Sequence, residues 1–235
     1  MAGWFRRVVA SVVAEHNEQR RAPHSCGLEG ACDVADAMVK SGKAKKMLVI
    51  GAETFTRILD WQDRTTAVLF GDGAGAVVLE AIEDQPDWGV LSSSLFTDGR
   101  FRDLLYVDGG VSSSGEVGHV RMKGNEVFRH AVEKLSSSLD SALKLSGLSP
   151  ADIDWLVPHQ ANMRIIDSMQ RKFGMDSDKV IRTVSHHANT SAASIPLALN
   201  TAVQDGRISS GDIVAFEAIG GGLTWGASIA RIGRP

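Results

Sequence analysis

Two stretches of the chain repeat the same succession of local patterns, and this repetition restricts the possible folds more than any other feature. Residues 39–43 (Val-Lys-Ser-Gly-Lys) and 203–207 (Val-Gln-Asp-Gly-Arg) each end a helical pattern with a glycine and a basic residue. A short linker, an apolar strand pattern, a glycine-rich turn and a last strand pattern follow in both places. Gly206 lies 164 residues after Gly42. Self-similarity of this kind predicts a duplicated α/β unit, and the alternative is coincidence in a short match.

Apolar periodicity along the chain alternates between helical and strand patterns, which is typical of α/β proteins. The expected helices cover residues 33–41, 126–143, 163–173 and 195–203, with a further helix start at 149–150. The expected strands cover residues 47–50, 66–70, 74–79, 155–157, 213–216 and 223–232. The segment 89–118 is rich in glycine and serine, so we expect an irregular surface connection there. The predicted halves are therefore residues 1–118 and 119–235.

Composition excludes several classes of function. The 235 residues are 43% hydrophobic, which is enough for a substantial core, and the net charge of −3 gives no general attraction to nucleic acid. No apolar run approaches the roughly 18 residues that a membrane helix needs. The N-terminus lacks the features of a secretory leader, so we expect a cytoplasmic protein with free thiols. Neighbouring histidines on a strand would point to opposite faces, so no metal site is expected at 186–187.

Two polar side chains stand where an apolar strand pattern ends and a helix pattern begins. These are His159, in the stretch 158–162, and Asn189, in the stretch 188–194. A neutral imidazole and an amide can both donate hydrogen bonds to one oxygen, which stabilises negative charge that develops there during a reaction. Taken singly, each has an ordinary explanation, because His159 could be a satisfied strand-end histidine and Asn is a favoured N-cap.

A nucleophile for such a site requires one of the two cysteines. Cys26 directly precedes a predicted helix, whose positive dipole end favours the thiolate, although a buried inert cysteine is the alternative. Cys32 falls inside the helix pattern and is expected in the core. The offset of 164 residues aligns Ser25 with Asn189 and Cys26 with Thr190. The thiol and the amide would then occupy equivalent strand-to-helix connections in the two halves.

In combination, these motifs resemble the β-ketoacyl-acyl-carrier-protein synthase III family, thiolase-fold enzymes that start bacterial fatty-acid synthesis. The matching stretches are residues 39–42, 63–64, 70–75, 124–128, 155–162, 189–194 and 220–226. Coverage extends from about residue 35 to residue 232 in the family's order and spacing. The resemblance implies an α/β fold with duplicated, thiolase-like α/β/α/β/α layers, an incomplete first half, and a homodimer.

The resemblance also implies an acyltransferase. The implied reaction condenses an acyl-CoA, expected to be acetyl-CoA, with malonyl-acyl-carrier protein and releases carbon dioxide. Coenzyme A enters as a thioester substrate, and no bound cofactor is implied. The implied catalytic residues are Cys26, His159 and Asn189, with Gly221 in the oxyanion hole. The implied carrier-protein contacts are Gln160, Ala161, Asn162, Met163 and Arg164. The implied coenzyme A contacts are Arg64, Met122, Phe128, Asn162 and Arg164.

The first 25 residues depart from the family pattern. Counting back without a gap from residues 39–42 places the nucleophile at Ser25, so either one residue is deleted or Cys26 is incidental. The charged segment 15–21 is a poor central strand. We therefore expect a wrong start or a disrupted reading frame and a poorly active chain. The alternatives are an impaired remnant that retains only partner binding, or a thiolase-fold enzyme that uses other acyl donors.

An acidic carrier protein needs a local basic patch on a chain whose net charge is negative. The candidates are Arg121, Lys123, Arg129, Arg164, Arg171 and Lys172. The alternative is that these side chains belong to ordinary solvated helix faces.

Overall fold

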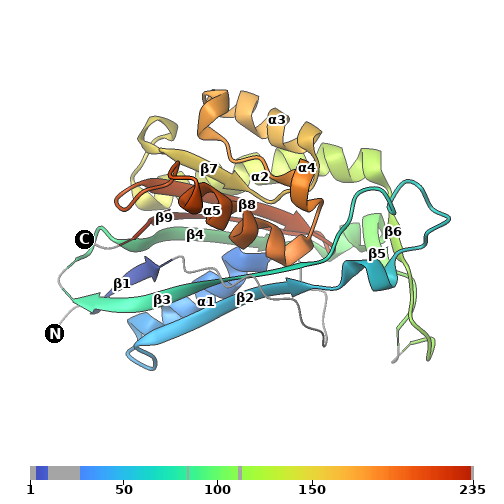
Figure 1. The fold of residues 1–235 in the computed structure, drawn as a ribbon, viewed down its shortest axis with the longest axis horizontal. Coiled ribbons are helices and arrows are strands. Elements are labelled where there is room, and N and C mark those ends of the chain that lie inside the picture. The colour runs from blue at the N-terminus through green and yellow to red at the C-terminus, as the bar shows by residue number, and fades with distance from the viewer. Residues whose placement is uncertain (1–3, 10–26, 84, 111–112, 234–235) are drawn as a thin grey trace.

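The computed structural model describes residues 4–9, 27–83, 85–110 and 113–233, and these form two separate sheets and a small strand pair (Figure 1). The first sheet has the order β1-β3-β2, with both pairs antiparallel: β1 (Trp4–Val9), β3 (Gly73–Glu83) and β2 (Lys46–Glu53). The second has the order β4-β9-β8-β7: β4 (Gly89–Thr97), β9 (Thr224–Arg231), β8 (Ile213–Gly220) and β7 (Trp155–Pro158). The small pair joins β5 (Leu105–Val107) to β6 (Val120–Met122).

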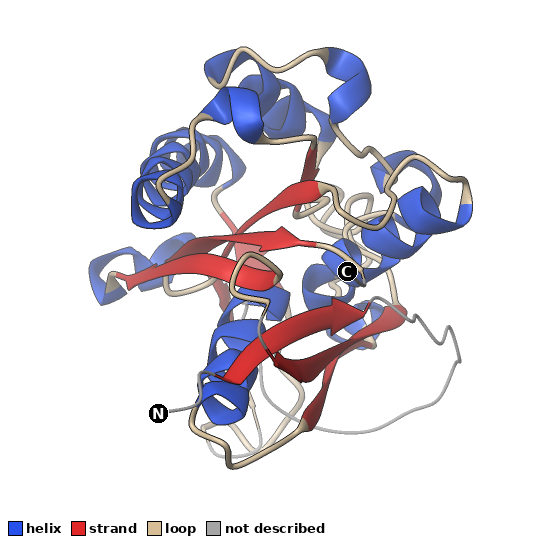
Figure 2. Ribbon diagram, turned by 90° about the vertical axis from the view of Figure 1, so that its left-hand side faces the viewer, coloured by secondary structure: helices blue, strands red, loops and turns tan. Residues whose placement is uncertain are grey.

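Helices lie between the two sheets and outside the second one (Figure 2). The helices α1 (Gly27–Lys40) and α5 (Ser194–Gln204) each contact strands of both sheets. The helix α2 (Gly124–Ser146) packs on the outer face of β4, β9 and β8, and α3 (Met163–Lys172) lies against α2. The expected α/β architecture with alternating helix and sheet layers is confirmed.

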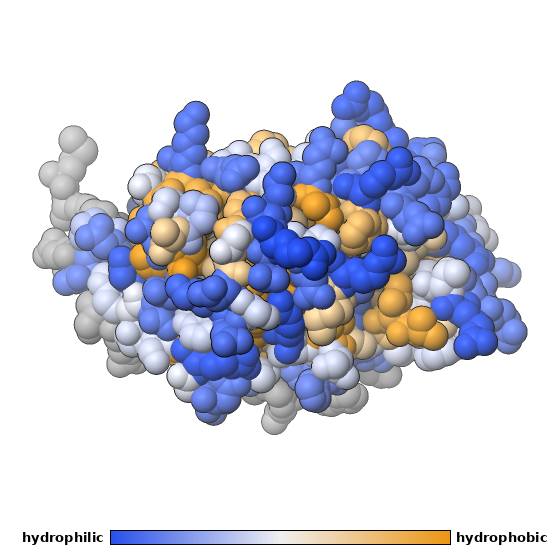
Figure 3. Space-filling model, turned by 90° about the horizontal axis from the view of Figure 1, so that it is seen from above, coloured by the Kyte–Doolittle hydropathy of each residue, from blue (hydrophilic) through white to orange (hydrophobic). Residues whose placement is uncertain are grey.

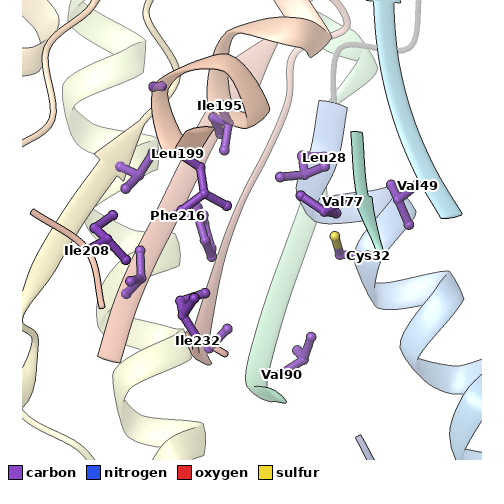
Figure 4. Packing of buried hydrophobic residues seen from close by; sticks show 14 of the residues in the cluster. Leu28, Cys32, Val49, Val77, Val90, Ile195, Leu199, Ile208, Phe216 and Ile232 are labelled. Carbon is purple, nitrogen blue, oxygen red and sulfur yellow. The ribbon is translucent and has the colours of Figure 1, made fainter. Parts of the chain in front are cut away.

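The main core lies between the sheets and combines side chains from both halves of the chain (Figure 4). Leu28 and Val77 belong to the first half, while Leu199 and Phe216 belong to the second. Cys32 is part of this cluster, so its predicted core role is confirmed. Burial, together with the nearby carboxyls of Glu29 and Asp33, raises the pKa of the Cys32 thiol, which therefore stays protonated.

The repeated sequence patterns correspond to two helix–turn–strand units. Gly42 and Gly206 end α1 and α5 with left-handed φ angles of 73° and 81°, a conformation that glycine adopts at low cost. The helix ends keep the offset of 164 residues, but β8 begins three residues later than that offset predicts from the start of β2. The linker is therefore longer in the second unit, and one constant offset does not carry through to the strands.

The strand expected at residues 66–70 is wrong, because this segment forms turns. The carboxylate of Asp63 accepts hydrogen bonds from the backbone N–H of Thr65 at 2.9 Å and from its hydroxyl at 2.6 Å. It also accepts one from the Thr66 hydroxyl at 3.1 Å. Local bonds of this kind compete with pairing into a sheet. Val68, which suggested a strand, is 70% exposed.

The irregular connection expected at residues 89–118 is also wrong in its first part, which forms β4. The serines that suggested a surface loop face α2: the Ser92 hydroxyl donates to the Ala142 carbonyl at 2.8 Å, and the Ser94 hydroxyl donates to the Ser138 carbonyl at 2.7 Å. Because β4 pairs with β9, the sheet of the second half includes a strand from before the predicted boundary at 118/119.

Short helical segments complete the described chain: η1 (Phe55–Ile58), η2 (Gly99–Leu104), η3 (Pro150–Asp152), η4 (Ser177–Lys179), α4 (Val184–His187) and η5 (Ser191–Ala193). The helix start at 149–150 yields only the single turn η3. His186 and His187 lie in α4 and not on a strand. Within the described ranges, no group of three or more His, Cys, Asp or Glu side chains could hold a metal ion, and no helix is long and apolar enough to cross a bilayer.

Candidate active site

His159 directly follows β7, at the end of the parallel pairing between β7 and β8. Its backbone N–H donates to the Glu217 carbonyl at 2.8 Å, which continues the sheet by one residue and fixes the position of the ring. The imidazole Nδ1 lies 2.6 Å from the Ser194 hydroxyl at the start of α5. The residue is half-buried at the pocket, and removal of the ring from water lowers the pKa of His159 from 6.5 to about 4. The imidazole is therefore neutral at pH 7 and can act as a hydrogen-bond donor.

Asn189 is held by backbone pairing with the first half of the chain. Its N–H donates to the Leu69 carbonyl, and its own carbonyl accepts from the Gly71 N–H, both at 2.9 Å. A Cβ at Gly71 would lie 3.2 Å from the Cβ of Ala188, so the close approach favours glycine. The side-chain Oδ1 of Asn189 accepts from the Ser191 N–H at 3.0 Å. The oxygen thus closes a local turn, and the amide NH2 group is left to donate.

Two residues close to Asn189, one directly before it and one two positions after it, have strained backbones. Ala188 and Ser191 have φ angles of 58° and 50°, a region that non-glycine residues rarely adopt. Each such residue costs roughly 1–3 kcal/mol and persists only where the surrounding structure holds it. The strained residues lie close to Asn189 on both sides. Packing of the surrounding structure therefore determines the backbone conformation there.

A small pocket joins three parts of the chain at this place. Its lining consists of Leu28, Glu29, His159, Ser191, Ala192, Ile195, Ala218 and Ile219. The start of α1, the end of β7 and the turn after Asn189 therefore meet, as the predicted site requires. Asn189 lies two residues before the lining residue Ser191. Cys26 lies outside the described residues, so its position beside His159 and Asn189 stays a prediction.

The glycine-rich turn 220–222 leaves the pocket directly after Ile219 and leads into β9. A Cβ at Gly221 would lie 2.8 Å from the Leu105 carbonyl oxygen, so no larger residue fits without a shift. Gly222 has a φ of 137°. The turn is therefore close-packed beside the pocket, and the role of Gly221 as an oxyanion donor stays a prediction.

Three of the expected coenzyme A contacts lie around one apolar cluster beside α2. The guanidinium of Arg164 stands 4.8 Å from the centre of the Phe128 ring, and both Phe128 and Met122 border the cluster that contains Ile219. Asn162 is the N-cap of α3, because its Oδ1 accepts from the Ile165 N–H at 3.0 Å.

Arg64 is exposed in the turn that follows η1 and is joined to this region indirectly. Arg121 bonds to Asp60 of that turn at 2.8 Å and also to Asp108. Because Arg121 precedes Met122 in β6, this ion pair holds the turn with Arg64 against the strand that carries Met122.

The five expected carrier-protein contacts differ in their exposure. Gln160 is fully buried: its Nε2 donates to the Pro158 and Ile181 carbonyls, and its Oε1 accepts from two backbone N–H groups. Its side chain therefore supports the loop from inside and does not face solvent, and a contact of residue 160 with the carrier protein stays a prediction. Met163 and Arg164 are exposed, while Ala161 and Asn162 are half-buried.

Of the six basic side chains proposed as carrier contacts, Arg121 pairs with Asp60 and Asp108, and the other five form no ion pair within the described part of the chain. The exposed ones are Lys123, Arg129, Arg164, Arg171 and Lys172. Seen from the side of α3, the surface is mostly hydrophilic with scattered apolar areas (Figure 3).

Two buried glutamates were not singled out from the sequence. Glu29 lines the pocket and Glu217 lies in β8, and none of their four carboxylate oxygens has a partner among the described residues. Burial raises the pKa of each to about 8, and the charge of Glu29 adds to the effect on Glu217. A usable signal existed for Glu217, since it is the single charge in the apolar run 213–219.

Comparison with known proteins places these features in one family. A family model described as the C-terminal part of 3-oxoacyl-(acyl-carrier-protein) synthase III matches residues 143–232, and one described as 3-oxoacyl-(acyl-carrier-protein) synthase III matches residues 24–99. The β-ketoacyl-(acyl-carrier-protein) synthase III of Sphingopyxis alaskensis is 61% identical over 202 residues, which are 86% of this chain and 63% of the relative. That of Rhodospirillum centenum is 62% identical over 207 residues, or 87% and 64%.

Solved structures agree with these sequence matches. The 3-oxoacyl-(acyl-carrier-protein) synthase III of Aquifex aeolicus VF5 has a TM-score of 0.82 at 42% identity, with 88% of this chain and 64% of that chain covered. The Pseudomonas aeruginosa PAO1 protein has a TM-score of 0.84 at 34% identity, with 89% and 65% covered. The fold is therefore thiolase-like, and the chain spans just under two thirds of the length of the curated relatives it matches.

Proposed function

Because this chain belongs to the 3-oxoacyl-(acyl-carrier-protein) synthase III family, we propose that it catalyses the condensation of an acyl-CoA such as acetyl-CoA with malonyl-acyl-carrier protein. This decarboxylative reaction would initiate fatty-acid synthesis. The observation that carries the proposal is the pocket in which neutral His159 meets the turn that follows Asn189.

The proposed reaction begins with transfer of the acyl group. The thiolate of Cys26 attacks the thioester carbonyl of the acyl-CoA, the carbon–sulfur bond to coenzyme A breaks, and coenzyme A leaves as a thiolate that takes up a proton. The product is an acyl-cysteine. A position just before α1 suits this step, because the positive end of the helix dipole favours thiolate.

Malonyl-carrier protein then loses carbon dioxide, and its thioester oxygen gains negative charge as an enolate forms. His159 and Asn189 donate hydrogen bonds to this oxygen. The enolate carbon attacks the acyl-cysteine carbonyl, whose oxyanion is stabilised by backbone N–H groups that include Gly221. This attack forms the new carbon–carbon bond, and collapse of the resulting intermediate breaks the carbon–sulfur bond and expels the Cys26 thiolate. Loss of one such donor costs about 10²–10³ in kcat in a comparable oxyanion hole.

The low pKa of His159 supports a donor role over a role as general base. A pKa of about 4 means that the ring is almost entirely neutral at pH 7, and it would be a weak base there. A neutral imidazole that polarises a carbonyl oxygen is an established catalytic device.

We also propose that the carrier protein docks on the exposed basic side chains around α2 and α3, and that coenzyme A lies along Arg64, Met122, Phe128, Asn162 and Arg164. The family assignment supports a homodimer that works in the cytoplasm, with the coenzyme A thioester as substrate and no bound cofactor.

The test measures carbon dioxide release from malonyl-carrier protein. His159→Ala should reduce the rate by about 100-fold or more, because it removes one donor to the enolate oxygen. His186→Ala is the matched control, since this histidine is exposed and does not line the pocket, and it should stay within about 2-fold of the wild type. Equal rates for the wild type and His159→Ala would refute the proposed role of His159.

A second candidate is a remnant that only binds the carrier protein. The observation in its favour is the ungapped count that places Ser25 at the nucleophile position. Intact-mass measurement after incubation with acetyl-CoA separates the two, because an acetylated chain that loses the label in Cys26→Ala supports the enzyme. A chain that never acetylates, yet binds the carrier protein, supports the remnant.

A further inference from the structure

The hydroxyl of Ser194 stands at the junction of the pocket histidine and α5. Ser194 is 1% exposed and is the first residue of α5. Its Oγ lies 2.6 Å from the Nδ1 of His159 and accepts a hydrogen bond from the Gln160 N–H at 3.2 Å. The same oxygen therefore contacts both the ring and the backbone of the loop that carries it.

The hydrogen-bond inventory of a hydroxyl decides the direction of the short contact. A serine hydroxyl has one hydrogen to donate and two lone pairs to accept. The Gln160 N–H already occupies one lone pair. If Nδ1 carried the ring proton, the oxygen would accept twice and its own hydrogen would need another acceptor. No further partner of this hydroxyl is present among residues 27–83, 85–110 and 113–233. Because a buried polar hydrogen without a partner is costly, the hydroxyl donates to Nδ1.

We propose that Ser194 is a positioning residue that holds His159 as the tautomer with its proton on Nε2. The Nε2–H is then the ring donor available to the pocket, since Nδ1 is occupied by Ser194. The catalytic value of this arrangement rests on the proposed function, because only an Nε2–H can donate to a developing enolate oxygen there. The tautomer itself does not depend on any activity.

A hydroxyl is chemically suited to this task in a way that a carboxylate is not. A carboxylate at Nδ1 would accept the ring proton, place it on Nδ1 and stabilise the imidazolium. A hydroxyl that donates to Nδ1 leaves the ring neutral and points its remaining N–H in the opposite direction. The carboxyls of Glu29 and Glu217 are the buried acids of this region, and neither bonds to the ring.

The primary test is the nitrogen NMR spectrum of the full chain labelled with 15N-histidine. The chain has seven histidines, so the His159→Asn variant identifies the signals of His159 by their absence. The expected result for the wild type at pH 7 is a protonated Nε2 and an unprotonated, hydrogen-bonded Nδ1. A protonated Nδ1 in the wild type would overturn the proposal, whether or not the chain is active.

Variants then test whether Ser194 is the cause. Ser194→Ala should convert His159 to a mixture of tautomers, while Ser194→Thr keeps a hydroxyl and should preserve the wild-type pattern. Ser185→Ala is the matched control, because Ser185 also contacts a histidine, with Oγ 3.1 Å from the Nδ1 of His186, but at the surface. It should leave the signals of His159 unchanged. An unaltered tautomer in Ser194→Ala would overturn the proposal, and if the variants do not fold, the wild-type spectrum alone decides.

The kinetic consequence is measured separately. Ser194→Ala should lower kcat for malonyl decarboxylation by about 10-fold with little change in KM, because the donor to the enolate oxygen is lost in part of the molecules. Absence of decarboxylation in the wild type would count against the proposed function and would leave the spectroscopic result to judge the role of Ser194.

Discussion

The strands β2 and β8 follow the same helix–glycine–linker pattern, yet their surroundings differ. All eight residues of β8 are buried, and it pairs with β7 on one side and β9 on the other. Of the described strands, only β3 pairs with β2, in which Leu48 and Ile50 are 59% and 61% exposed. The outer face of β8 is covered by α2, while Leu48 and Ile50 have no such cover in the described part of the chain. Similar local sequence thus gives the same element, but the neighbours decide how much stability its apolar residues contribute.

The largest expected effect is a difference in stability between the two strands. Phe216→Ala in β8 should destabilise the protein by about 3–5 kcal/mol, because it leaves a cavity in the core between the sheets. Leu48→Ala in β2 should cost less than about 0.5 kcal/mol, since the side chain is mostly exposed. Urea unfolding of both variants measures the difference. Similar costs would show that the outer face of β2 is covered in solution.

A somewhat smaller effect is expected where β2 meets the second half. A Cβ at Gly51 would lie 2.2 Å from the carbonyl oxygen of Ala192, a residue that lines the pocket. Gly51→Ala should therefore destabilise by about 1–3 kcal/mol through overpacking and displace the turn after Asn189. Gly99→Ala is the control, because a Cβ there meets no atom within 4 Å. Equal urea midpoints for the two variants would contradict this contact.

The carboxyls of the two strands should differ in their response to pH. Glu53 of β2 has a hydrogen-bond donor in the Ala192 N–H, whereas neither carboxyl oxygen of Glu217 in β8 has a partner among the residues described. Burial raises the pKa of Glu217 from 4.5 to about 8. The folded state therefore keeps a proton that the unfolded state loses in this range, so stability falls as pH rises from 4.5 through about 8.

Glu217→Gln tests this difference, because it removes the ionisation at nearly constant size. The free energy of unfolding of the variant should fall less with rising pH than that of the wild type. At pH 9 the variant should be more stable than the wild type by about 1 kcal/mol or more. Urea unfolding between pH 5 and pH 9 measures the slope. Glu53→Gln, whose carboxyl has a donor, should change the slope less, and a larger change there would reverse the comparison.

The last expected effect is on binding and not on stability, and it concerns the proposed carrier contact on the second half. Arg164→Glu should weaken binding of an acidic carrier protein by about 10-fold and reduce its dependence on salt. Lys43→Glu makes the same change of charge on the exposed linker before β2 and should leave binding nearly unchanged. Binding measurements at two salt concentrations separate the variants. An equal loss for both would mean that only net charge matters.

Much of the fold follows from local patterns in the sequence. The helices α2, α3 and α5 and the strands β2, β3, β7, β8 and β9 all appear where apolar periodicity predicts them. The turn at 66–70 was not predicted. Threonine and valine favour a strand there, but hydrogen bonds to the side chain of Asp63 stabilise a turn. The strand β4 was also not predicted, because its sequence favours a loop. Its serines suggest a loop, yet their hydroxyls bond to carbonyls of α2, which lies about 50 residues away in sequence.

For the site, the sequence alone identified His159 and Asn189 as candidates. His159 does follow a buried strand, whereas Asn189 follows the short helix α4 and not the apolar strand that was expected before it. The sequence did not identify Ser194, Glu29 or Glu217 as neighbours or buried groups, and it assigned Gln160 a surface role. Those properties arise from contacts between residues far apart in the chain. Such contacts create burial, carboxyls without a partner among the residues that the structure describes, and a 2.6 Å contact to one ring nitrogen. Periodicity thus determined which elements form and which residues end them, whereas tertiary packing decided the protonation state of those residues and the direction in which they can donate.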